Sequence, residues 1–213
     1  MIINKNESVM VDNIDDLYVL LNRKNNKIFE LNQMGYLIWM SIADGMEKEH
    51  MCTIISENTE DLPNNFIKEI DDYMDLMNQE GIINFSDEKS KLSLSDVRAN
   101  FVKKFIKEVG YHVLKYRGSS MASVFNEGQM VLVEKFSPET IQIGDIVIFS
   151  MVDSVELVIH RIIDVKSDEI GEKKIVTKGD NCDDTDEASI EKFAGKAIIP
   201  KILKPKNLFL KKM

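Results

Sequence analysis

The sequence predicts an α+β protein: a first domain built from a small β-sheet and three helices, followed by a mostly β second domain. Between residues 33 and 80, apolar side chains recur at the three- and four-residue spacing of amphipathic helices. From residue 130 onwards, apolar residues instead form short β-branched runs between polar turns, which is typical of strands. A polar, serine-rich stretch over 86–95 separates the two patterns and predicts an exposed connection.

The first domain begins with three short runs whose alternating apolar residues predict antiparallel strands. These runs cover residues 9–11, 18–21 and 28–31. Three helices follow, over 33–43, 47–57 and 63–80. Asn32 can cap the first helix, Pro63 suits the first turn of the third, and Gly81 ends it. A last strand over 82–85 completes a winged-helix-like arrangement.

The second half of the chain contains five β-branched runs that predict strands. They cover residues 130–133, 146–149, 155–159, 174–177 and 196–199. A helix is predicted before them, over 96–109. The sequence therefore divides into a first domain over 1–86, a linker and connecting helix over 87–110, and a second domain over 111–213.

The composition is that of a globular protein, because 44% of the 213 residues are hydrophobic and 30% are charged. No run approaches the roughly 18 apolar residues that a membrane helix requires, and no basic segment precedes an apolar stretch at Met1. We therefore expect a soluble, cytoplasmic protein without an integral membrane segment. Cys52 and Cys182 lie far apart without metal-type spacing around either, so we expect no metal and no cofactor. The oligomeric state is not determined by the sequence.

Charge is unevenly distributed along the chain. The net charge is −9, and residues 1–86 hold sixteen acidic and six basic side chains, a net charge of −10. An acidic first domain repels the phosphates of nucleic acids and suits a basic peptide. The same charge is also typical of a solvated surface that keeps a protein soluble.

Three segments of the second domain indicate chemistry, and each lies beside a predicted strand: 118–121, 158–161 and 177–186. A serine hydroxyl is a poor nucleophile unless a base removes its proton, and a histidine does this when a carboxylate fixes its tautomer. Ser120, His160 and Asp186 supply these three residue types. Taken singly, each also has a structural explanation, as a turn serine, a histidine at a strand end and an aspartate in a solvated loop.

The motifs Gly118-x-Ser-Met121, Gly144-Asp-Ile-Val147, His160-Arg161 and Thr177-Lys-Gly-Asp-Asn181, in this order, resemble the signal peptidase family over residues 116–200. Bacterial-type members use a lysine base, whereas endoplasmic-reticulum-type members have a histidine followed by arginine, so this sequence is similar to the histidine type. The resemblance implies a β-rich, partly barrel-like domain that cuts an extended peptide after small residues. The family's usual membrane anchor is missing here, which favours a cytosolic peptide as substrate.

The resemblance also assigns roles to residues. Ser120 is expected to be the nucleophile, His160 the general base, Asp186 the orienting carboxylate and Asp180 a supporting acid. Asp184 is an alternative for either acidic role. Oxyanion binding or support of the site is expected from the neighbouring positions Ser119, Met121 and Arg161.

Three positions depart from the family pattern around the nucleophile. Ser123 stands where the family usually has proline, Gln129 where an aspartate often follows the glycine, and Gly118 where many members have a serine that donates to the oxyanion. These departures bear on rate and cleavage preference, since all three predicted triad residues are present.

The first domain resembles the PqqD-like peptide-recognition domains of ribosomal peptide modification over residues 8–85. The resemblance rests on Asn32-Gln-Met-Gly-Tyr-Leu-Ile-Trp39, Asp44-Gly45 and Asn78-Gln-Glu-Gly-Ile82, together with the order of strands and helices. It implies that a leader peptide adds as a strand beside residues 27–31, with its side chains against the third helix. The peptide-binding residues expected on this basis are Lys27, Ile28, Phe29, Glu30, Leu31, Ile70 and Met74.

Together, the two resemblances predict a serine endopeptidase that removes the leader from a ribosomally synthesised, post-translationally modified precursor peptide. One alternative is a peptide-binding protein with an inactive peptidase half. Another is a winged-helix DNA-binding regulator with a self-cleaving, repressor-like peptidase domain. Charge argues against DNA as a partner, because the third helix carries Glu69, Asp71, Asp72 and Asp75 and has Lys68 as its one basic residue. Repressor-like peptidases also use a lysine base, where this chain has His160.

Overall fold

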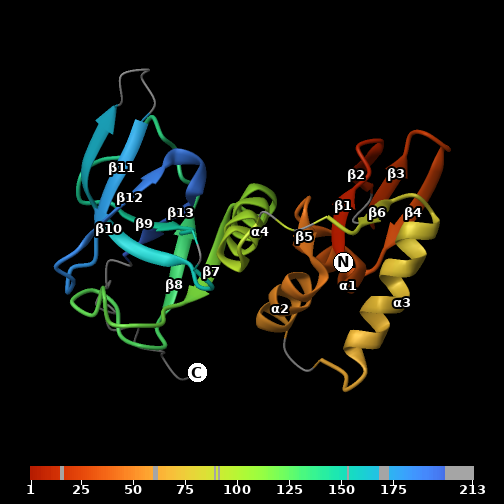
Figure 1. The fold of residues 1–213 in the computed structure, drawn as a ribbon, viewed down its shortest axis with the longest axis horizontal. Helices are drawn as coiled ribbons and strands as arrows, with labels where there is room; N and C mark the ends of the chain where they lie inside the picture. The colour runs from red at the N-terminus through yellow and green to blue at the C-terminus, as the bar shows by residue number, and fades with distance from the viewer. Residues whose placement is uncertain are drawn as a thin grey trace, which may run out of the picture.

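The structure of the protein is a computed structural model, which describes residues 1–14, 17–59, 62–88, 90, 92–152, 154–167 and 173–199. It confirms the predicted α+β class, with a helix-containing first part and a mostly β second part (Figure 1). Residues 200–213, at the end of the predicted second domain, lie outside the described residues. No helix within the described ranges is long and apolar enough to cross a membrane.

The first part contains two small antiparallel sheets and three helices. One sheet has the order β2-β3-β4, and the other has the order β5-β1-β6. The strands are β1 (Ile2–Lys5), β2 (Val9–Ile14), β3 (Leu17–Asn22), β4 (Lys27–Leu31), β5 (Met46–Glu47) and β6 (Ile83–Ser86). The helices are α1 (Gln33–Ser41), α2 (Lys48–Asn58) and α3 (Phe66–Gln79). The Asn32 side chain accepts a hydrogen bond from the Gly35 N–H at 2.7 Å, and it therefore caps α1 as predicted.

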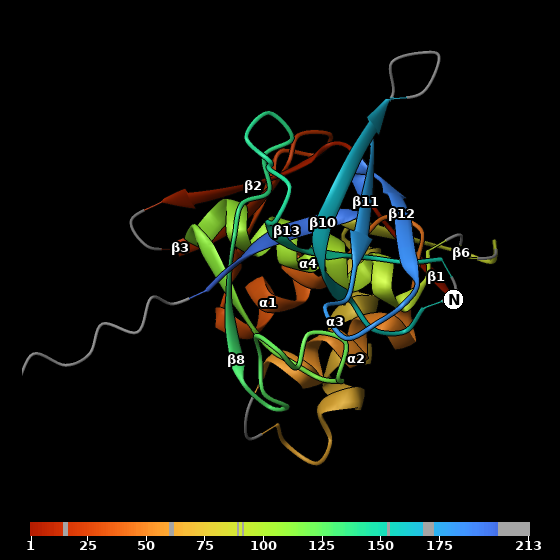
Figure 2. The same ribbon diagram turned by 90° about the vertical axis from the view of Figure 1, so that its left-hand side faces the viewer.

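The second part is built on one seven-stranded antiparallel sheet of order β12-β11-β10-β9-β13-β8-β7. Strands β10, β11 and β12 lie side by side in Figure 2. Its strands are β7 (Tyr111–Lys115), β8 (Met130–Glu134), β9 (Ile146–Phe149), β10 (Val158–Ser167), β11 (Lys173–Lys178), β12 (Thr185–Ser189) and β13 (Phe193–Ile198). The strand predicted over 155–159 instead begins at Val158 and runs on to Ser167. The last strand begins at Phe193 rather than Lys196, so it also includes Ala194 and Gly195.

Helix α4 (Leu94–Val109) lies between the two parts and packs into both (Figure 1). A capping box formed by Ser93 and Asp96 begins the helix, and Gly110 ends it with a left-handed φ of 93°. Val97 and Phe101 belong to the core of the first part, whereas Ala99, Val102 and Ile106 belong to that of the second. The division at residues 86 and 110 stays a prediction, and the predicted connecting helix contributes buried side chains to both cores.

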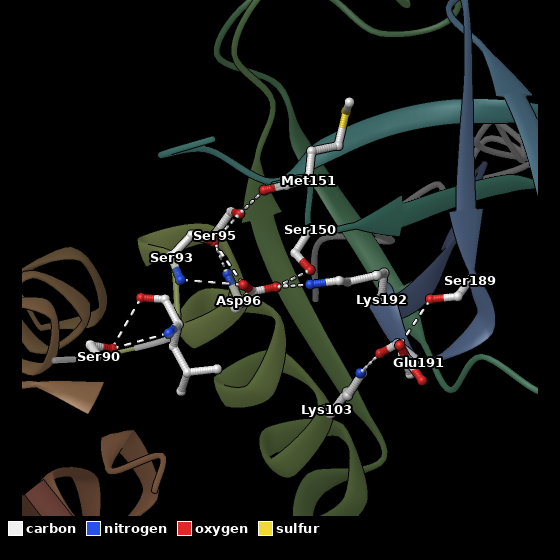
Figure 3. A network of polar contacts seen from close by, with 11 residues as sticks. Ser90, Ser93, Ser95, Asp96, Lys103, Ser150, Met151, Ser189, Glu191 and Lys192 are labelled. Carbon is white, nitrogen blue, oxygen red and sulfur yellow. Dashed lines mark hydrogen bonds and ion pairs between the residues drawn. The ribbon is translucent and has the colours of Figure 1, made fainter. Parts of the chain in front are cut away.

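A polar network fixes the start of α4 to the second part (Figure 3). Asp96 Oδ1 accepts hydrogen bonds from Ser150 Oγ at 2.7 Å and Lys192 Nζ at 2.9 Å. The hydroxyl of Ser95 donates to the Met151 carbonyl at 2.9 Å. Burial raises the pKa of Asp96, but the hydrogen bonds from Lys192, Ser150 and Ser93 outweigh it and lower the pKa to about 2.

Arg98, on the same helix, connects α4 to both parts. Its guanidinium donates to both carboxylate oxygens of Glu57, at the end of α2, and to the Val155 carbonyl. Glu156 Oε2 lies 3.2 Å from the same guanidinium. Because the Arg98 side chain is only 10% exposed, these partners compensate a charge that would otherwise be costly to bury.

We expect Asp96→Asn to lower the free energy of unfolding by roughly 1–3 kcal/mol, because Lys192 loses its anionic partner. In the wild type, a depressed pKa stabilises the fold above about pH 4, and that contribution is lost as the pH falls toward 2. Urea unfolding at neutral pH and at low pH measures both effects. The exposed change Asp87→Asn is the control, and equal losses in the two variants would show that the network contributes nothing specific.

His112 of β7 is buried between the rings of Phe101 and Phe105, whose centroids lie 5.7 and 5.0 Å away. Burial lowers its pKa to about 4. The unfolded chain therefore takes up this proton first, and stability should fall as the pH decreases from about 6.5 to 4, by on the order of 3 kcal/mol. His112→Phe should flatten the dependence of the unfolding free energy on pH across this window, as measured by unfolding at several pH values. An unchanged slope would show that other groups cause the pH dependence.

Candidate active site

Ser120, His160 and Asp186 line one cleft of about 730 Å³. Strand β7 forms one wall of the cleft, and the residues leading into β10 form another. The structure thus brings together three side chains that are separated by 40 and 26 positions in the sequence. Their common cleft is the first requirement for a shared chemical role.

The imidazole of His160 is held by Asp186. His160 Nδ1 lies 2.7 Å from Asp186 Oδ2, and the two side chains are 11% and 22% exposed. His160 sits on β10, and Asp186 sits on β12, two strands away, where it pairs with Thr177 of β11. Asp184 is exposed, so Asp186, and not Asp184, has the geometry of a carboxylate that orients the imidazole.

Gly179 makes this arrangement possible, because it has no side chain where three others converge. A Cβ on Gly179 would lie 2.9 Å from both His160 Nε2 and Ser120 Cβ, and 2.8 Å from Cys182 Sγ. Ser120 and the free nitrogen of His160 therefore approach each other across this glycine. The Gly-Asp-Asn motif provides the space that the two side chains share.

The loop that carries Ser120 is fixed by hydrogen bonds to its backbone. The Asn181 N–H donates to the Ser120 carbonyl at 2.9 Å, and Asn181 Nδ2 donates to the Ser119 carbonyl at 3.1 Å. The Met121 N–H donates to the buried Tyr116 hydroxyl at 2.8 Å. In this structure, Ser119 and Met121 support the loop through these contacts, and the Met121 N–H is not directed at an oxyanion.

Asp180, in the same loop as Asn181, forms a second polar contact with Arg161 of β10. Arg161 Nε and Nη2 donate to the two carboxylate oxygens of Asp180 at 2.9 and 2.7 Å. The pKa of Asp180 is lowered mainly by this hydrogen bonding, which also raises the pKa of Arg161. Ser123 Oγ donates to Asp180 Oδ2 at 2.9 Å. Ser123, at the position where the resemblance implies a proline, thus connects the Ser120 loop to Asp180, a contact that the sequence did not predict.

The expected peptide-binding residues are divided between surface and core. Residues 27–31 form β4, which is an edge strand of its sheet. Ile28 is 64% exposed, and Lys27 Nζ contacts Glu80 at the end of α3 at 2.6 Å. Ile70 lines a cavity of about 220 Å³ between α1 and α3. Met74 is 1% exposed and Leu31 is also buried, so both pack into the core instead of facing a peptide.

The first part and α4 also contribute residues to this cleft, and no sequence motif predicts that they do. Its lining includes Ile54, Glu57 and Asn58 of α2, together with Arg98 and Phe101 of α4. None of these residues belongs to a motif, and they reach the cleft because α4 packs against both cores. A sequence pattern cannot indicate that these distant residues lie at the same cleft.

Comparison with known families found two matches that follow one another along the chain. Residues 18–83 match the family described as coenzyme PQQ synthesis protein D (PqqD), and residues 81–173 match the peptidase S24-like family. No curated protein and no solved structure matches the chain. The second match includes Ser120 and His160 and ends before Asp180 and Asp186. From its N-terminus to its C-terminus, the chain therefore contains a PqqD-like segment followed by a segment similar to S24-like peptidases.

Proposed function

We propose that the protein is a serine endopeptidase that captures the leader of a ribosomally made precursor peptide and cuts it from the core. The observation that carries this proposal is the contact between His160 and Asp186 beside Ser120, in a chain whose first part is PqqD-like. The peptidase-like match supports hydrolysis of a peptide bond. The PqqD-like match supports a precursor peptide as the substrate.

The proposed reaction follows from the orientation of the imidazole. With its Nδ1–H donated to Asp186, the His160 ring leaves Nε2 free to accept the Ser120 proton. Ser120 Oγ then attacks the scissile carbonyl, and His160 delivers the proton to the leaving amine. Water, activated by the same nitrogen, hydrolyses the acyl-enzyme. Gly118 offers no hydroxyl to the oxyanion, so this charge falls to backbone N–H groups around Ser120.

Leader capture is proposed at the free edge of β4. Within the described residues, β3 is the only strand hydrogen-bonded to β4, so its outer edge can accept another strand. The exposed Ile28 supplies an apolar contact at this edge. The acidic character of the first 86 residues favours a leader that carries basic side chains.

The first test is cleavage of the precursor-like peptide encoded nearest this gene, followed by mass spectrometry. Ser120→Ala and His160→Ala should each reduce turnover by several orders of magnitude, because the two residues act as one unit. Asp186→Asn should cost a large part of the rate, while the exposed Asp184→Asn serves as its matched control. Full activity of Asp186→Asn would remove it from the triad. A cut that persists in Ser120→Ala would refute the serine mechanism, whereas tight binding without any cut would favour an inactive recognition protein.

The second test addresses leader capture by point substitution, because removal of the first domain would expose Val97 and Phe101 of α4. In a Ser120→Ala background, Ile28→Ser should weaken binding of the same peptide by about tenfold, since an apolar contact is lost. Met10→Ser is the matched control. Met10 is a similarly exposed apolar residue on β2, the opposite edge strand of the same sheet. Fluorescence anisotropy measures both affinities, and a loss confined to Met10→Ser would place the leader on β2 instead.

A further inference from the structure

We infer that the end of α2 forms part of the peptidase cleft and contacts the substrate on the leader side of the scissile bond. This inference rests on the proposed function and extends it. Ile54, Glu57 and Asn58 line the same cleft as Ser120 and His160. Since α2 belongs to the PqqD-like segment, the recognition domain would then contribute to cleavage specificity as well as to capture.

The position of α2 beside the cleft is fixed by buried contacts. Ile54 is 1% exposed and packs in one core with Val97 and Phe101 of α4. Glu57 is held by the guanidinium of Arg98, which also contacts Glu156, next to the residues that lead into β10. The end of α2 is therefore tied to the wall of the cleft. Its place in the lining of the cleft is therefore determined by specific contacts.

The size of the cleft suits more than one residue of substrate. Its volume of about 730 Å³ lies within the range of about 300–1,000 Å³ that is typical of ligand sites. An extended peptide advances by about 3.3 Å per residue, so a chain bound at Ser120 continues along the cleft past its neighbouring walls. The cleft is thus large enough to hold the substrate residues next to the scissile bond.

The direction of that peptide follows from where its leader is held. A precursor bound on β4 enters the cleft from the first domain, and α2 is the element of that domain that lines the cleft. The chain near α2 is therefore the leader, which becomes the acyl side of the intermediate. Asn58, which is exposed and lines the cleft, is the position at which this contact is most easily changed.

Two phosphonate probes test the inference without knowledge of the precursor. A small alkyl fluorophosphonate reacts with Ser120 by loss of fluoride and occupies only the scissile position. A tetrapeptidyl diphenyl phosphonate ending in an alanine analogue reacts by loss of phenoxide and also fills the acyl side. Intact-mass spectrometry over time gives a rate constant for each probe, and Ser120→Ala identifies the labelled residue.

The measured quantity is the ratio of the tetrapeptidyl rate constant to the small-probe rate constant. Asn58→Trp should lower this ratio by about tenfold or more, because the indole obstructs the acyl side. The matched control is Ser56→Trp. Ser56 lies on the same turn of α2 but outside the cleft, and like Asn58 it donates one side-chain hydrogen bond to the helix backbone. Its ratio should equal that of the wild type.

An unchanged ratio in Asn58→Trp would overturn the inference while leaving the peptidase proposal intact. Absence of Ser120 labelling by the small probe in the wild type would instead overturn the peptidase proposal. Circular dichroism verifies that each variant is folded. Asn58→Arg provides a second obstruction of the same position if the tryptophan variant does not fold, and it is expected to lower the ratio in the same direction.

Discussion

The structure depends on one helix being buried by two cores at once. Val97 and Phe101 complete the core of the first part, and Val102 and Ile106 complete that of the second. Full burial of a side chain of this kind contributes about 1.5–3 kcal/mol, so neither core keeps its stability if α4 is displaced. The polar contacts of Asp96 and Arg98 fix the position of α4 along its axis and its rotation about that axis. The placement of the first part beside the cleft follows from this shared packing.

Much of the fold could be predicted from the sequence because periodicity is strong where elements are long. The predicted helices match α1 to α4 within a few residues, and the strand over 146–149 has the predicted bounds. Strands β1, β5, β7 and β12 were missed. β5 has two residues, and β12 reads Thr-Asp-Glu-Ala-Ser, a composition with low strand propensity that is held in place by pairing with β11.

The candidate site shows the same contrast between local pattern and tertiary placement. Motifs indicated Ser120, His160 and Asp186, and the structure places them in one cleft. Neither the contact of Ser123 with Asp180 nor the approach of α2 to the cleft could be predicted, because each depends on segments far apart in the sequence. Where the signal peptidase pattern has proline, Ser123 provides a hydrogen bond between loops instead of local backbone rigidity, so this difference need not loosen the loop that carries Ser120.

The shared helix has a consequence for the length of a substrate. The edge of β4 and the hydroxyl of Ser120 belong to two parts whose separation α4 fixes. Under the proposed function, a peptide held at the first and cut at the second must span that separation with a defined number of residues. The protein would then act as a molecular ruler. The distance from the bound segment, as well as the residues at the scissile bond, would determine the cleavage position.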